Sequence, residues 1–119
     1  MVKIALLSTL LYVASYSQTL YADEKETLEK ACLSCHKAQQ IPNKLIYRRY
    51  LMKYSTTSQM HKVIYSYLKN PTTQQSIMPP QFFLKFPRKE ASHLEDVQLK
   101  ELIREYLDRF DIRGMLILN

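Results

Sequence analysis

The sequence predicts an all-α protein, and three observations support this prediction. Among 119 residues there is one glycine, and no long segment alternates apolar with polar residues as a half-buried strand does. The clearest periodic pattern is helical, because apolar residues recur at positions 60, 63, 64, 67 and 68, which is the spacing of an amphipathic helix. A chain of this length forms one domain at most.

The first 22 residues have the layout of a secretory signal peptide. Lys3 gives a positive start, residues 4–13 are apolar, and small and polar residues lead to Ala22, the expected last residue before cleavage, with Ser17 as the second choice. An uncleaved membrane anchor is the alternative, but the apolar run is shorter than the ~18 residues that a membrane span needs. We therefore expect a signal peptide over residues 1–22, export to the periplasm, and a mature domain over residues 23–119.

The mature chain is expected to begin with a helix over residues 23–36. Asp23 can cap this helix, and acidic residues crowd its first turn, where they interact favourably with the helix dipole. The residues that share one face of this helix are Leu28, Ala31, Cys32 and Cys35.

Two further helices are expected before a proline-rich loop. The first follows Asn43, and its apolar face consists of Tyr47, Tyr50, Leu51 and Tyr54. The second covers the amphipathic segment over residues 59–70 and is stopped by Pro71. Residues 71–87 contain four prolines and cannot form a regular helix. Because this loop is also rich in apolar side chains, we expect it to lie against an apolar surface.

The last helix is expected to begin with a capping box formed by Ser92 and Glu95. Gly114 fits a position just past its end. Its buried stripe is expected to consist of Leu99, Leu102, Ile103, Tyr106, Leu107 and Phe110.

Cys32, Cys35 and the adjacent His36 form the one motif that indicates a specific chemistry. A disulfide would close too small a loop to constrain the unfolded chain, and a thioredoxin-like site needs a strand before the motif. A tetrahedral zinc site needs two more ligands, and only the isolated His61 and His93 remain. Covalent haem attachment fits best, because two thiols one helical turn apart can bond to two vinyl groups while the next histidine binds the iron.

The chain resembles the class I monohaem c-type cytochromes over the whole mature domain. The resemblance rests on a helix leading into Cys32-x-x-Cys35-His36, on the "MPP" sequence at Met78, on an amphipathic helix before that loop, and on a last helix with "LIREYL". It implies a cytochrome c-like fold of about four helices around one haem c, attached through Cys32 and Cys35.

The resemblance also implies the residues around the iron. His36 and Met78, which are 42 residues apart, are the expected axial ligands, and Met78 is the one methionine followed by two prolines in an apolar loop. Pro42 is the candidate that presents its carbonyl group to the imidazole N–H. Tyr67 is the candidate whose hydroxyl group reaches the methionine sulfur, with plain core packing as an equal alternative.

The charge of the chain is distributed unevenly along the sequence. No acidic residue occurs between Glu29 and Glu90, whereas that interval holds eleven lysines and arginines. Lys3 is the one charged residue among residues 1–22, so their removal changes the net charge from +6 to +5. Such a distribution favours encounter with acidic redox partner proteins or membrane respiratory complexes, with contact to anionic lipid as a further option. Nucleic acid is not an expected partner of an exported chain.

We therefore expect a monomeric periplasmic carrier of single electrons, and not an enzyme. The alternative function is a haem-based sensor or small-ligand binder, in which Met78 is absent from the iron or easily displaced.

Overall fold

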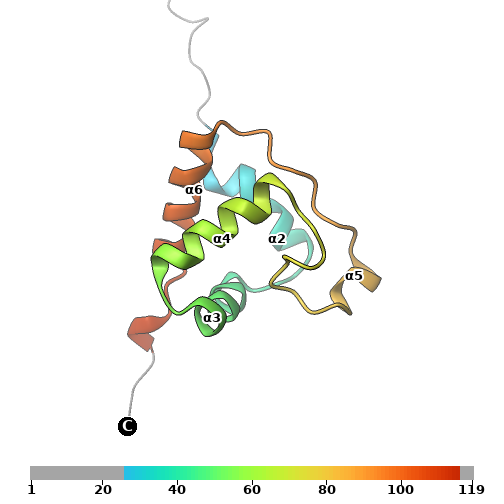
Figure 1. The fold of residues 1–119 in the computed structure, drawn as a ribbon, viewed down its shortest axis with the longest axis horizontal. Helices are drawn as coiled ribbons and strands as arrows, with labels where there is room; N and C mark the ends of the chain where they lie inside the picture. Colours follow the sequence, from blue (N-terminus) through green and yellow to red (C-terminus); the bar gives the residue numbers. More distant parts are fainter. Residues whose placement is uncertain (1–25, 116–119) are drawn as a thin grey trace, which may run out of the picture.

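The structure, a computed structural model, describes residues 26–115, and every regular element in this range is helical. In chain order the elements are η1 (Glu29–Leu33), α2 (Ser34–Ala38), α3 (Asn43–Tyr54), α4 (Thr57–Lys69), α5 (Phe82–Lys85), α6 (Asp96–Arg109) and η2 (Arg113–Met115). The prediction of an all-α chain is therefore confirmed for the described residues (Figure 1). The expected signal peptide and Asp23 lie outside them. No helix between residues 26 and 115 has the length and apolar character that crossing a membrane requires.

The helix predicted over residues 23–36 begins later than predicted, because residues 26 and 27 are not helical, and it changes its winding in the middle. Leu28 precedes a π-helical turn, η1, which continues without a break into α2. The backbone N–H of Ser34 donates to the carbonyl oxygen of Glu29, five residues earlier, which is the hydrogen bond that defines a π-helix. Such turns inside α-helices often occur at functional sites, and this one contains Cys32 and ends three residues before His36.

Helices α3 and α4 follow the predicted pattern closely. Ile46, Tyr47 and Tyr50 are the buried residues of α3, and Met60 and Ile64 are those of α4. Between the two helices, the side chain of Thr56 accepts a hydrogen bond from the backbone N–H of Gln59 at 3.2 Å. This bond caps α4, and Pro71 follows two residues after its end.

The buried stripe of α6 is confirmed except for Phe110, which is the C-cap residue and only partly buried. The predicted ends of this helix are wrong. Glu95 is the N-cap residue, and its side chain makes no capping bond. Ser92 instead accepts a hydrogen bond from the N–H of Leu94. At the other end, α6 stops at Arg109, and Gly114 lies inside the separate turn η2. The stripe residues Leu99, Leu102, Ile103, Tyr106 and Leu107 are buried.

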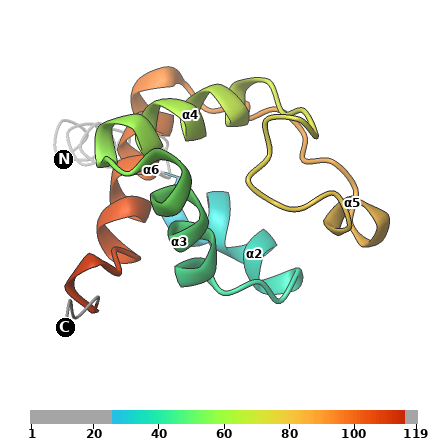
Figure 2. The same ribbon diagram turned by 60° about the horizontal axis from the view of Figure 1, so that its bottom comes forward.

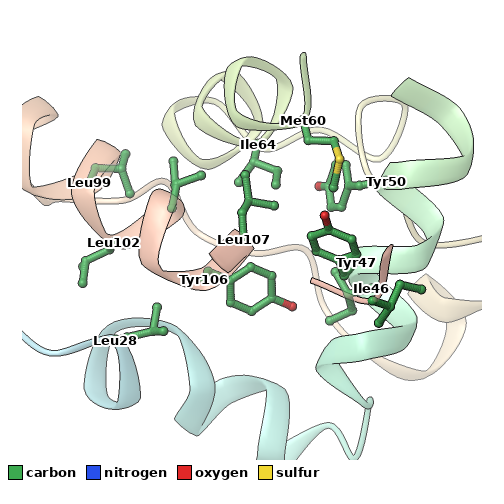
Figure 3. Close-up of a cluster of buried hydrophobic side chains, with 12 residues drawn as sticks. Leu28, Ile46, Tyr47, Tyr50, Met60, Ile64, Leu99, Leu102, Tyr106 and Leu107 are labelled. Atoms are coloured by element: carbon green, nitrogen blue, oxygen red, sulfur yellow. The ribbon is translucent and has the colours of Figure 1, made fainter. Parts of the chain in front are cut away.

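The core lies where α6 crosses α4 and faces η1 and α3. Its most deeply buried side chains are Leu28, Tyr47, Met60, Leu99 and Leu107, each less than 2% exposed (Figure 3). Polar contacts outside this core also connect α4 with α6. Among them, the His61 ring donates from Nε2 to the Lys100 carbonyl at 3.0 Å, and Lys69 pairs with Asp96 at 2.9 Å. Together, η1, α3, α4 and α6 form the helical frame that supports the rest of the chain.

Residues 70–95 form a long loop whose base is closed and whose far end carries α5. The backbone N–H of Ser92 donates to the carbonyl oxygen of Leu68 at 2.8 Å, so the returning chain is attached to the last turn of α4. Figures 1 and 2 both show α5 far from α3, α4 and α6. The prolines prevent a long helix here, as predicted, although one short turn, Phe82–Lys85, does form.

The turn after α2 reverses the chain directly behind His36. The N–H of Ile41 donates to the His36 carbonyl at 3.2 Å, and the N–H of Gln40 donates to the Lys37 carbonyl at 3.1 Å. This pair of bonds is the Schellman motif, which usually has glycine in the left-handed position. Here Gln40 occupies that position with φ 56°. The turn brings the start of α3 back to the imidazole ring.

Replacing Gln40 by glycine should therefore stabilise the fold. A left-handed conformation costs a residue with a Cβ atom about 1 kcal/mol, which glycine avoids. We expect the free energy of unfolding in urea to rise by about this amount. The control is Gln39→Gly, because Gln39 is right-handed with φ −81° and should lose about 0.5–1 kcal/mol. Equal effects of the two substitutions would contradict this explanation.

Candidate functional site

A cavity of about 410 Å³ lies between the helical frame and the long loop. It is lined by residues of η1, α2, α3, α4 and α6, and by residues 76–90 of the loop. Its volume falls in the range of roughly 300–1,000 Å³ that is usual for small-molecule and cofactor sites. Five of the six residues singled out from the sequence line this cavity: Cys32, Cys35, His36, Tyr67 and Met78.

The walls of the cavity are mainly apolar and aromatic. Helices α3, α4 and α6 contribute Ile46, Tyr50, Ile64, Leu102 and Ile103, and the opposite wall contains Phe82 and Phe83. The expectation that the proline-rich loop lies against an apolar surface is therefore confirmed only in part, because Leu84 at its tip is 89% exposed. The side of the loop that carries Phe82 and Phe83 faces the cavity.

The two cysteines stand on the wall formed by η1 and α2. Both are free thiols; Cys32 is half-buried and Cys35 is exposed. Burial raises the pKa of the Cys32 thiol, and the positive charge of Lys89 opposes this shift. Cys32 is therefore a protonated thiol at neutral pH, held in an apolar wall within one turn of a second thiol.

His36 is held in a defined orientation by a side chain of α3. Its Nδ1 lies 2.6 Å from Oδ1 of Asn43. An amide oxygen only accepts hydrogen bonds, so Nδ1 carries the proton and Nε2 keeps its lone pair. Burial lowers the pKa of the His36 imidazole, with the Asn43 hydrogen bond opposing this shift and Lys89 adding to it. His36 is therefore neutral at pH 7 with Nε2 available as a metal ligand.

Pro42 does not occupy the place that the sequence suggested for it. Its carbonyl oxygen accepts hydrogen bonds from the N–H groups of Leu45 at 3.0 Å and Ile46 at 3.3 Å, as the N-cap residue of α3. Pro42 is exposed and is not part of the cavity wall. The neighbouring side chain, Asn43, is the hydrogen-bond partner of the imidazole. Sequence reasoning placed Asn43 just before α3 and gave it no role at the site.

Met78 is the one methionine of the described chain that lines the cavity. Met52 and Met115 are 74% and 61% exposed, and Met60 is fully buried in the core. The backbone N–H of Met78 donates to the hydroxyl of Ser76 at 3.1 Å, and Pro79 accepts a hydrogen bond from the N–H of Phe82 at 3.0 Å. Turns on both sides therefore fix the backbone that carries Met78.

The other two histidines are not at the cavity. His61 donates to a backbone carbonyl on α6, and His93 is exposed in the segment before α6. Within residues 26–115, no cluster of three or more His, Cys, Asp or Glu residues is arranged to hold a metal ion directly.

Besides Asn43, three residues at the site were not expected from the sequence: Tyr106, Arg88 and Lys89. Tyr106 was expected only in the core stripe of α6, but it also lines the cavity and its hydroxyl donates to Oδ1 of Asn43 at 3.1 Å. Arg88 and Lys89 were noted only as part of the basic surface, yet both line the cavity beside Glu90. Tyr67 lines the same cavity as Met78.

Comparisons of the chain with protein-family models, curated proteins and solved structures found no match. Its function is therefore inferred from its own residues.

Proposed function

We propose that the protein is a periplasmic carrier of single electrons that holds one haem c. Cys32 and Cys35 hold the macrocycle through thioether bonds, and His36 and Met78 are the axial ligands of the iron. The observation that supports this proposal most strongly is the set of side chains that line one cavity. Segments 42 residues apart in the sequence supply two thiols, a neutral imidazole and a thioether to the same cavity.

The residues present fit such a group in their chemistry. The two thiols on one wall are suited to attachment, and the imidazole has its Nε2 lone pair free because Nδ1 is bonded to Asn43. Apolar walls exclude water from the iron ligands. Arg88 and Lys89 place positive charges at the same cavity, where they can pair with the carboxylates of a haem.

Each protein group then has a defined task. His36 and Met78 would hold the iron, and Tyr67, which lines the same cavity, would position the sulfur of Met78. The loop over residues 76–90 forms one wall of the site. When bound, a low-spin haem with histidine and methionine ligands supplies a one-electron couple. Basic residues of the chain, such as Arg88 and Lys89 at the cavity, favour acidic redox partners by long-range attraction.

A redox titration of the purified, exported protein tests this proposal. We expect one reversible one-electron transition and no binding of carbon monoxide to the reduced protein at neutral pH, because Met78 occupies the sixth position. Ready binding of carbon monoxide would contradict stable ligation by Met78 and favour the haem-based sensor. Absence of a reversible couple would contradict the carrier function.

A further inference from the structure

The amide oxygen of Asn43 accepts two hydrogen bonds from different parts of the chain. One comes from Nδ1 of His36 at 2.6 Å, and the other from the hydroxyl of Tyr106 at 3.1 Å. The same hydroxyl lies 3.4 Å from the backbone carbonyl oxygen of Asn43. Tyr106 is 63 residues away in the sequence, on α6. A continuous chain of hydrogen bonds therefore joins the last helix to the imidazole.

The orientation of this amide decides which nitrogen of His36 carries the proton. With Oδ1 toward the ring, Nδ1 is the donor and Nε2 has the lone pair that a metal needs. With the amide reversed, its NH₂ group would donate to Nδ1, and the proton would then reside on Nε2. The two orientations of one side chain thus correspond to a ligating and a non-ligating imidazole.

Two features hold the amide and the ring in the first orientation. The Schellman turn at residues 36–41 fixes the backbone between His36 and α3. The Tyr106 ring meets the His36 ring edge-on, with centroids 5.8 Å apart and planes at 79°, and its hydroxyl donates to Oδ1. Tyr106 is itself fixed, since it is only 6% exposed in the core and its ring lies between α6 and α3 (Figure 3).

We propose that Asn43 and Tyr106 are positioning residues for His36, and that through them helix α6 helps to set the reduction potential of the site. The Tyr106 hydroxyl keeps the Asn43 oxygen facing Nδ1, and that oxygen makes the imidazole a stronger electron donor to the metal. This inference rests on the proposed function. It adds a role for α6, which is connected to His36 through the side chains of Tyr106 and Asn43.

Opposite substitutions at position 43 provide the first part of the test, measured on the haem-loaded protein. Asn43→Leu removes the acceptor, so the imidazole becomes a weaker donor and the potential should rise. Asn43→Asp supplies a charged acceptor, so the potential should fall. We expect each to change the ratio of oxidised to reduced protein at a fixed potential by about tenfold, which is about 59 mV for one electron. Shifts of the same sign would contradict the proposal.

A double-mutant cycle with Tyr106→Phe provides the second part. The loss of the hydroxyl frees the amide to turn, so we expect a smaller rise in potential and faster hydrogen exchange of the His36 Nδ1–H. In the Asn43→Leu background the same substitution should change neither quantity further, because the two residues act through one oxygen. Equal effects in both backgrounds would mean that Tyr106 acts only by packing, and would overturn the proposal.

Tyr47→Phe is the matched control. Tyr47 is a buried tyrosine of α3 whose hydroxyl bonds to Asp111 and which is not part of the cavity wall. Its loss should leave the potential unchanged even if it lowers stability. A shift as large as that of Tyr106→Phe would overturn the proposal. A wild-type protein with no reversible couple would instead contradict the proposed function, so the two failures are distinguishable.

Discussion

The exported chain should lose all covalently bound haem when Cys32 and Cys35 are both replaced by alanine. Both sulfur atoms stand on one wall of the cavity, and no other cysteine is present in the sequence to replace them. The mass of the denatured protein should fall to that of the bare polypeptide. Each single variant should retain a haem through one remaining thioether bond, in reduced yield.

Ser34→Ala is the matched control for this experiment. Ser34 lies between the two cysteines, is exposed, and donates its hydroxyl to the Lys30 carbonyl four residues earlier. It tests whether any change in this helix prevents loading. Full haem content in Ser34→Ala and none in the double variant is the expected pair of results. Covalent haem in the double variant would contradict attachment at this motif.

Met78→Ala should open the sixth position of the iron. The weak absorption band that arises from sulfur bound to ferric iron should disappear, and the reduced protein should bind carbon monoxide at neutral pH. Because methionine ligation raises the potential of a haem, we also expect the potential to fall by more than about 59 mV, the shift for a tenfold change in a one-electron equilibrium.

Met60→Leu is the control for the loss of a thioether elsewhere. Met60 is fully buried in the core, and leucine has a similar volume, so stability should change by less than about 1.5 kcal/mol. The sulfur band should persist in this variant. If the band persisted in Met78→Ala as well, the sixth ligand would be another residue. Met78 would then line the cavity without binding the iron.

The sequence predicted most of the helices because their apolar faces are long and regular. The apolar residues of α4 repeat at helical spacing from Met60 to Leu68, and the buried residues of α6 do so from Leu99 to Leu107. Burial of such a stripe outweighs local preferences. The cysteine motif and Met78 were also identifiable from sequence, because the residue types are rare in the chain and their neighbours are distinctive. Whether these residues meet at one cavity depends on the path of the long loop over residues 70–95, which has no such periodicity.

The details that were missed depend on competition between similar local interactions. Ser92 and Glu95 match the capping-box pattern, but the bond from Ser92 N–H to the Leu68 carbonyl orients this segment along the end of α4 instead. Gln40 takes a left-handed conformation that sequence patterns assign to glycine. That turn determines which neighbour reaches the His36 ring, so the partner is Asn43 and not Pro42. A contact with α4 decided the first case, and a local turn decided the other two.

The pyridine haemochrome spectrum of the purified, exported protein is the most direct test of the central claim. The protein should first be extracted with acidified organic solvent, which removes haem that is not covalently attached. We predict that the haem stays with the polypeptide and gives the spectrum of a haem whose two vinyl groups are both saturated by thioether bonds. Haem that leaves with the solvent, or a protein that contains none, would contradict the claim that Cys32 and Cys35 hold a haem c.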